Sequence, residues 1–134
     1  MGRFLQGARE AEGTAIIIDV FRAFTTAAVA LSRGAISIAL VAKTEEALEL
    51  RRLGVGELCM GEVNGIRPEG FDFGNSPYEI SQADVAGKRL IQSTQAGTVG
   101  VAAAHSAKRI YAGSLVIADA TVKAVLGGSP KVVS

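Results

Sequence analysis

Strand-like and helix-like patterns of apolar and polar residues alternate along this chain. The first predicted strand, 15–20, begins with a continuous apolar run rich in β-branched residues, which is typical of a strand buried on both faces of a parallel sheet. Further strands are predicted at 36–41, 57–60, 89–93 and 109–112. Predicted helices follow them at 24–32, 44–53, 78–82, 99–107 and 115–126. A sixth strand begins at 131–134. This rhythm predicts an α/β fold, a three-layer α/β/α arrangement around a mostly parallel sheet.

Residues that start and stop helices support these boundaries. Gly34 and Gly54 stand where two of the helices should end. Thr44 is predicted to cap one helix and Ser76 another, with Pro77 at the first helical position of the second.

The strand–helix rhythm breaks at 61–77, which reads GEVNGIRPEGFDFGNSP. A loop of this length in a compact domain tends to be functional, and its glycines let the backbone approach a ligand closely. Its polar side chains can supply oxygen ligands, hydrogen bonds or charge: Glu62, Arg67, Asp72, Asn75 and Ser76. The structural alternative is a stiff Ω-loop with Phe71 and Phe73 tucked beneath it.

Composition fits a single aliphatic domain. Of the 134 residues, 49% are hydrophobic and only 5% aromatic, which suits α/β layers packed with small aliphatic side chains. With 14 basic and 13 acidic residues the net charge is +1, which gives no electrostatic case for nucleic acid as a partner.

The single cysteine and single histidine are not predicted to act chemically. Cys59 excludes an internal disulfide and is expected to be a buried, inert thiol in a reducing cytoplasm. His105 falls within a predicted helix, so we expect a surface or partly packed side chain. The apolar stretch 25–42 is interrupted by Ser-Arg-Gly, which favours a helix followed by a strand over a membrane span.

Asp19 lies at the end of the first predicted strand, Arg22 follows it, and Thr25 and Thr26 open the next helix. The carboxyl ends of parallel strands form the crevice in which α/β proteins bind ligands. An acid, a guanidinium and two hydroxyls near a helix N-terminus suit an anion, with or without a metal ion. The structural alternative is an Asp–Arg pair that ties the strand to the helix.

The turn after the fourth predicted strand reads STQAGT. Thr94, Gly97 and Thr98 bring hydroxyls and a flexible backbone to a helix N-terminus, which suits phosphate. A capped turn explains the same residues equally well. Gly113 and Ser114 repeat the pattern after the fifth strand, where capping is the favoured interpretation.

Four segments resemble successive motifs of the 2-phosphosulfolactate phosphatase (ComB-like) family. They read IIIDVFRAFTTAAVAL, GEVNGIRPEGFDFGNSPYE, GKRLIQSTQAGTVGVAAA and YAGSLVIADATVKAV, and they keep the family's order from about Ala15 to the end of the chain. The resemblance implies a three-layer α/β/α fold and a magnesium-dependent phosphatase. Its namesake reaction converts 2-phosphosulfolactate to sulfolactate and phosphate, a step towards coenzyme M.

The positions that match the family's motifs include most of the candidate site residues. They are Asp19, Arg22, Thr26, Glu62, Gly70, Asp72, Gly74, Asn75, Ser76, Pro77, Thr94, Gly97, Thr98, Gly113 and Ser114. One departure lies in the turn after the fourth strand, where the family reads more like TTNGT. Ala96 takes the place of a polar asparagine there, which weakens the expected phosphate contacts.

The leading hypothesis is a phosphoric monoester hydrolase that acts on a small, doubly anionic phosphate ester. Asp19 is expected to bind Mg²⁺ or to act as the nucleophile, with Asp72 as a second metal ligand. Arg22 would hold anionic groups and Glu62 would serve as the acid–base group. The predicted substrate-binding residues are Thr25, Thr26, Asn75, Ser76, Thr94, Gly97, Thr98 and Ser114.

The length of the chain, compared with that of the family, suggests an alternative function. Members of the family run past 200 residues, so residues 1–134 are expected to be a single α/β domain and the N-terminal part of a longer fold. The alternative is a non-catalytic relative that binds a phosphorylated metabolite or only assembles with partner chains. A homo-oligomer stays open as well, because a shortened sheet has an exposed edge.

Overall fold

The computed structural model describes residues 2–134, with side chains from residue 4. The helices are α1 (Gly2–Glu10), α2 (Ala23–Ser32), α3 (Thr44–Arg52), α4 (Pro77–Ser81), α5 (Gly97–Ala103), the 3₁₀ helix η1 (Leu115–Ile117) and α6 (Ala118–Gly127). The strands are β1 (Thr14–Ile18), β2 (Ser37–Val41), β3 (Leu58–Gly61), β4 (Arg89–Ser93) and β5 (Arg109–Gly113). Within the described residues, no helix has the length and apolarity needed to cross a membrane.

The five strands form two parallel sheets. In one sheet β1 pairs with β5, and in the other β4 lies between β2 and β3. Residues 132–134 also run parallel to β1: the Ser134 amide donates to the Thr14 carbonyl (2.8 Å) and the Ile16 amide donates to the Ser134 carbonyl (3.0 Å). The α/β class and the parallel pairing are confirmed, and the strands lie in two sheets where the sequence suggested one.

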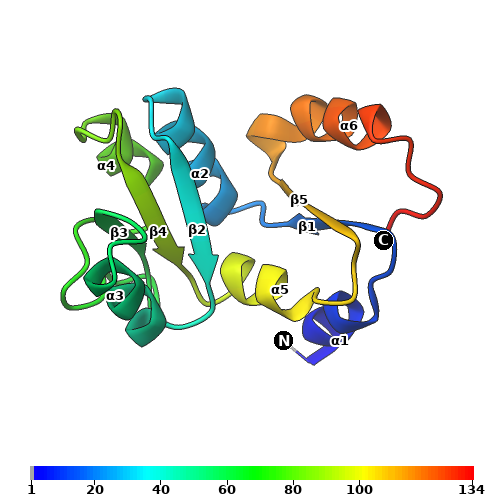
Figure 1. Ribbon diagram of the computed structural model, residues 1–134, viewed down its shortest axis with the longest axis horizontal. Coiled ribbons are helices and arrows are strands. Elements are labelled where there is room, and N and C mark those ends of the chain that lie inside the picture. The colour runs from blue at the N-terminus through cyan, green and yellow to red at the C-terminus, as the bar shows by residue number, and fades with distance from the viewer. Residues whose placement is uncertain (1) are drawn as a thin grey trace.

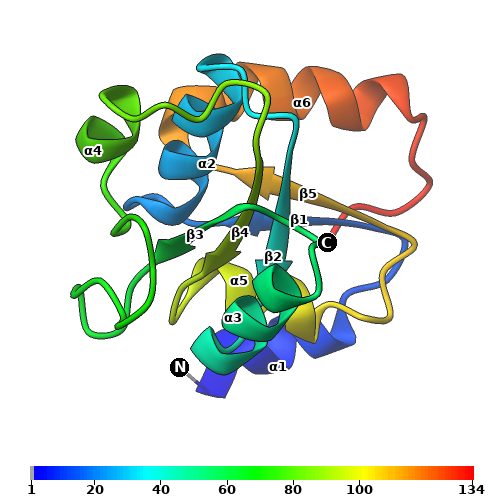
Figure 2. The same cartoon turned by 60° about the vertical axis from the view of Figure 1, so that its left-hand side comes forward.

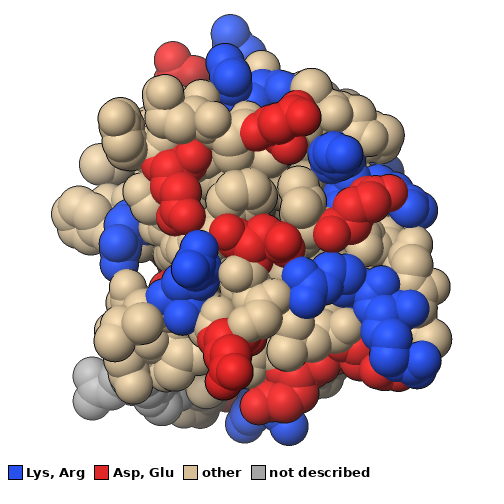
Figure 3. Space-filling model, turned by 90° about the vertical axis from the view of Figure 1, so that its left-hand side faces the viewer, with Lys and Arg blue, Asp and Glu red and all other residues tan. Residues whose placement is uncertain are grey.

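Helices cover the strands on both sides. Helices α2, α4 and α6 lie on one side and α1, α3 and α5 on the other (Figure 1), and the turned view in Figure 2 keeps this division. The predicted three-layer arrangement is therefore present. Figure 3 shows the end of the molecule that carries α3 and α4, where basic and acidic side chains are interspersed without a patch of one sign.

Three aliphatic clusters hold the layers together. One joins α2 and α4 to the second sheet through Ala30, Met60, Ile80 and Leu90. A second joins α3 to that sheet through Ala47, Cys59 and Ile91. A third joins α1, α2 and the end of α5 to β1 through Ala8, Ile17, Phe24 and Ala104. Because protein interiors are close-packed, these contacts fix the strand ends that carry the candidate site.

Most element boundaries lie within two residues of the sequence prediction. The predicted helix 115–126 is divided into η1 and α6, and residues 131–134, predicted to begin a sixth strand, form only an isolated bridge between Val133 and Thr14. Three further differences concern helices. Helix α1 was not expected. The cap of α3 is Lys43, so Thr44 is the first helical residue and its side chain does not cap. Helix α5 ends at Ala103, because a turn after Ala104 carries the chain back to β5; His105 is exposed in that turn and lies outside any helix. The Ser76 cap of α4 is confirmed, since its hydroxyl accepts from the Glu79 amide (3.3 Å).

Strand β3 ends in a glycine for a steric reason. Gly61 has a φ of 154°, and a Cβ built on it would overlap the backbone carbonyl of Ser93 in β4. The Gly61 amide donates to the Phe73 carbonyl (3.2 Å). A side-chain-free backbone is thus what allows the loop 61–77 to leave the sheet beside β4.

Candidate active site

The carboxyl ends of strands from both sheets meet at Asp19 and Glu62. Asp19 follows β1, and Glu62 follows β3. The two side chains lie close enough for the negative charge of Glu62 to raise the pKa of Asp19, while the positive charge of Arg22 lowers it. Arg22 and Glu62 thus lie within range to act on the charge of Asp19, and the binding role expected of these residues stays a prediction.

The half-buried carboxylate of Asp19 faces the N-termini of two helices. Burial raises the pKa of Asp19 above its ordinary value, and hydrogen bonds from the backbone of Ala23 and Gly97 partly offset this effect. Ala23 is the first residue of α2 and Gly97 the first of α5. Free amides at helix N-termini stabilise negative charge, so the same place that holds this carboxylate also suits a bound anion.

Because Gly97 has no side chain, the start of α5 can lie close to Asp19 and to α2. A Cβ at this position would lie 2.9 Å from the Cβ of Ala23, 3.0 Å from Oδ2 of Asp19 and 3.2 Å from Cζ of Phe24. Gly97 therefore contributes its backbone to the site, and the lack of a side chain lets α5 and α2 share one aspartate.

The ionisation of Asp19 is expected to cost stability as the pH rises. Because its folded pKa is raised above the ordinary value of 3.8, the folded state binds the proton more tightly, and the free energy of unfolding falls as pH rises through that window. Asp19→Asn cannot ionise, so its free energy of unfolding, minus that of the wild type, should increase as the pH rises above the ordinary pKa of 3.8. Urea unfolding in a chelating buffer measures both, and a pH-independent difference contradicts the assignment.

Arg22 is held in a strained backbone conformation. It precedes α2 with φ 103° and ψ −44°, in a region that non-glycine residues rarely adopt. Such strain costs about 1–3 kcal/mol and is concentrated at functional sites. Its exposed guanidinium reaches the loop 61–77, because a Cβ at Gly65 would lie 3.9 Å from Nη2 of Arg22.

Glu62 ties the loop 61–77 to the turn after β4. Its carboxylate accepts from the amides of Gly65 (2.8 Å) and Gln95 (2.9 Å), and Oε1 of Gln95 in turn accepts from the Asn64 amide (2.8 Å). These bonds orient Glu62 beside Asp19. They also occupy part of the hydrogen-bonding capacity that an acid–base group would use.

The hydroxyls of Thr94 and Thr98 each accept a hydrogen bond from the backbone amide of the other residue. The Thr94 amide donates to Oγ1 of Thr98 (2.8 Å), which donates to the Thr94 carbonyl (2.8 Å), and the Thr98 amide donates to Oγ1 of Thr94 (3.2 Å). Both side chains are buried. The structure thus favours the capped-turn interpretation for these hydroxyls and leaves the Gly97 backbone as the group of this turn that faces Asp19.

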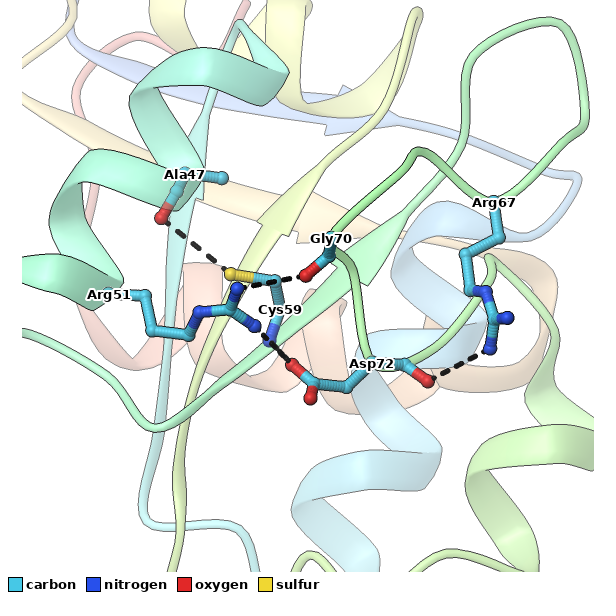
Figure 4. A network of polar contacts seen from close by, with 6 residues as sticks. All are labelled: Ala47, Arg51, Cys59, Arg67, Gly70 and Asp72. Atoms are coloured by element: carbon cyan, nitrogen blue, oxygen red, sulfur yellow. Dashed lines mark hydrogen bonds and ion pairs between the residues drawn. The ribbon is translucent and has the colours of Figure 1, made fainter.

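Asp72 belongs to a different network, shown in Figure 4. Its carboxylate accepts from Nη1 of Arg51 (2.9 Å) and from the amide of Cys59 (2.8 Å), and its carbonyl accepts from Arg67 (3.3 Å). Arg51 also donates to the Gly70 carbonyl (2.9 Å). Asp72 therefore pins the loop to α3 and β3, and the structure does not bring it to Asp19. Cys59 is fully buried there, as expected, and burial raises the pKa of its thiol.

The donor set around Asp19 limits the kind of metal site that can form. Among the described residues, no group of three or more His, Cys, Asp and Glu side chains is placed to hold an ion. Mg²⁺ is commonly bound through one or two carboxylates while it keeps several waters. Asp19 and Glu62, whose negative charges repel across the site, fit that sparse arrangement.

The remaining predicted binding residues are mostly buried. Among the described residues, Oγ1 of Thr26, Oδ1 of Asn75 and Oγ of Ser114 have no hydrogen-bond partner. Thr25 is half-buried in the first turn of α2, and Ser76 is engaged as the cap of α4. The buried oxygens without partners are unusual features, because buried polar atoms normally find one.

Gln92 is a polar residue at this site that the sequence interpretation missed. It is fully buried in β4, where Nε2 donates to the Ala23 carbonyl (2.8 Å) and Oε1 has no partner among the described residues. It thereby fixes the start of α2, whose backbone faces Asp19. A glutamine inside the apolar run 89–93 was the available signal.

Comparison with known proteins gives one consistent result. The sequence model described as 2-phosphosulpholactate phosphatase matches residues 4–134. A protein of Deinococcus radiodurans named "Probable 2-phosphosulfolactate phosphatase" is 41% identical over 113 residues, which cover 84% of this chain and 47% of that protein. A protein of the same name from Thermoplasma volcanium is 39% identical over 129 residues, 95% of this chain and 60% of that one. The chain spans about half the length of the curated relatives it matches.

Proposed function

Because the chain belongs to the 2-phosphosulpholactate phosphatase family, we propose that it carries the Asp19 site of a magnesium-dependent phosphatase. The proposed substrate is 2-phosphosulfolactate or a similar small, doubly anionic phosphate ester, and the products are sulfolactate and phosphate. The observation that supports this most is the half-buried Asp19 carboxylate between two helix N-termini, with Arg22 and Glu62 beside it. A cytoplasmic location and a place on the route to coenzyme M stay predictions.

The residues of the site fit the demands of phosphate ester hydrolysis. The oxygen of water adds to phosphorus, the bond from phosphorus to the ester oxygen breaks, and the released alkoxide takes a proton. In this proposal Glu62 accepts the proton of the water and passes it on to the released alkoxide, and Arg22 binds the phosphate or the sulfonate in two-point fashion. Asp19 would hold Mg²⁺, which supplies charge neutralisation at the phosphoryl oxygens when bound.

Replacement of Arg22 by glycine should separate activity from stability. Arg22→Gly removes the guanidinium and relieves the positive φ, so we expect phosphate release to fall by about 10²-fold and the free energy of unfolding to rise by about 1 kcal/mol. Arg22→Ala is the matched control, because it removes the guanidinium and keeps the strain. It should lose the same activity without the gain in stability. Equal stability of the two variants in urea unfolding contradicts the strain argument.

The proposed function is tested by phosphate release from 2-phosphosulfolactate by the purified 134-residue chain, with Mg²⁺ and with a chelator. Magnesium-dependent release that the chelator stops would support the proposal for these residues. No release from a chain shown by circular dichroism to be folded would contradict activity of these residues alone. No observation on the fold or on the relatives favours the non-catalytic alternative.

A further inference from the structure

Gln92 is a polar residue in apolar surroundings. It belongs to β4, the middle strand of its sheet, and its side chain is fully buried. The neighbouring strands place Leu40 and Met60 beside it in register. Side chains alternate along a strand, so Leu90, which is also buried, lies on the same face. A leucine or methionine could therefore stand in place of Gln92 without burying a polar group.

Only one end of the Gln92 amide forms a hydrogen bond. Nε2 donates to the Ala23 carbonyl (2.8 Å), whereas Oε1 accepts from no donor among the described residues. A neutral hydrogen bond contributes modestly to stability, and a buried polar atom without a partner costs a comparable or larger amount. The stability of the fold therefore does not explain why a glutamine occupies this position.

The hydrogen bond from Gln92 reaches the residue whose amide faces Asp19. Ala23 is the first residue of α2; its carbonyl accepts from Gln92, and its backbone amide is hydrogen-bonded to the Asp19 carboxylate. Amides at the start of a helix have no partner within the helix, so contacts from outside fix their direction. Ala23 is thus held by Gln92 from one sheet and by Asp19, which follows β1, from the other.

The strained backbone of Arg22 makes such an anchor necessary. Arg22 immediately precedes Ala23 and has a φ of 103°. A conformation of this kind persists only where the surrounding structure constrains it, because the chain would otherwise relax. The bond from Gln92 is one such constraint, since it holds the residue after Arg22 to the buried middle of the second sheet.

We propose that Gln92 is a positioning residue of the Asp19 site, which fixes the first turn of α2 so that the Ala23 amide faces the Asp19 carboxylate. The fold would be at least as stable with an apolar residue in its place. The consequence for catalysis rests on the phosphatase function proposed above, whereas the consequence for the Ala23 amide does not.

The first measurement is amide exchange in Gln92→Met without substrate or metal. Methionine is close to glutamine in shape and has no group that donates to Ala23. The Ala23 amide should exchange at least about tenfold faster than in wild type, and the Gly97 amide, which binds Asp19 from α5, should change by less than about threefold. The urea midpoint should stay at or above that of the wild type.

The second measurement is phosphate release from 2-phosphosulfolactate with Mg²⁺. In Gln92→Met, kcat should fall about tenfold while KM stays within about twofold, because the Arg22 guanidinium remains but the Asp19 carboxylate is less well oriented. Leu90→Met is the matched control: it places the same residue on the same face of β4, in the cluster of Ala30 and Ile80. It should leave both kcat and the exchange of the Ala23 amide within about twofold of wild type.

Several results would overturn the positioning role of Gln92. These are an Ala23 amide that exchanges at the wild-type rate in Gln92→Met, equal acceleration at Ala23 and Gly97, or an unchanged kcat. A Gln92→Met chain that does not fold, or is less stable than Leu90→Met, would show that Gln92 serves the fold and not the site. If the wild-type chain releases no phosphate, the proposed function fails, and amide exchange and stability alone decide the role of Gln92.

Discussion

Asp19→Asn is expected to lower phosphate release by about 10²–10⁴-fold while the chain stays folded. The substitution keeps the shape of the side chain and removes the negative charge that faces Arg22 and the helix N-termini of α2 and α5. Asparagine offers only one carboxamide oxygen to a metal ion and cannot attack phosphorus. Release of phosphate at saturating 2-phosphosulfolactate and Mg²⁺ measures the loss.

Asp72→Asn is the matched control for this experiment. The chemical change is the same, but it falls in the network of Arg51 and Cys59, where it weakens an ion pair that is about one third exposed on each side. We expect the stability of the chain to fall slightly and phosphate release to stay within about threefold of wild type. If Asp72→Asn abolishes release in a folded chain while Asp19→Asn does not, the metal-binding role belongs to Asp72 and the proposed site is wrong.

Gly61→Ala is expected to destabilise the fold by more than about 3 kcal/mol. The added Cβ meets the backbone carbonyl of Ser93, which is held in the middle strand of its sheet and cannot move without breaking the pairing of β4. The positive φ of 154° adds strain to this overlap. The loop 61–77 that carries Glu62 would lose its anchor at the same time.

Gly54→Ala is the control that separates backbone strain from overlap with the Ser93 carbonyl. Gly54 also has a positive φ, of 78°, but a Cβ there meets no atom within 4 Å. Its replacement should therefore cost only the backbone strain, about 1 kcal/mol. Urea unfolding of both variants gives the comparison, and similar losses for the two would show that the contact with Ser93 is not the cause.

Local features of the fold could be predicted because each depends on neighbouring residues. The apolar run 89–93 gave β4 with its observed bounds, and Ser76 followed by Pro77 gave the start of α4. Helix α1 was missed because Gly2 and Gly7 disfavour a helix and so short a helix is stable only when it packs, here through Ala8 against Ile17 of β1.

The candidate site could be predicted only in part, for a related reason. The placement of Asp19 and Arg22 at the end of β1 followed from the strand pattern. Three other interactions join segments far apart in the sequence. Asp19 contacts the start of α5, Gln92 donates a hydrogen bond to Ala23, and Asp72 forms an ion pair with Arg51. No local pattern encodes such pairings, because they depend on how the two sheets are placed by packing.

The division into two sheets has a consequence for how the chain reaches its structure. The β2-β4-β3 sheet is built from one uninterrupted stretch, residues 37–93, whereas β1 and β5 come from opposite ends of the chain. Loop-closure entropy opposes distant pairings, so the central stretch has the shorter search and is expected to form first. The Asp19 site draws on both sheets, so we expect it to be complete only when β1 and β5 have paired beside an already formed centre.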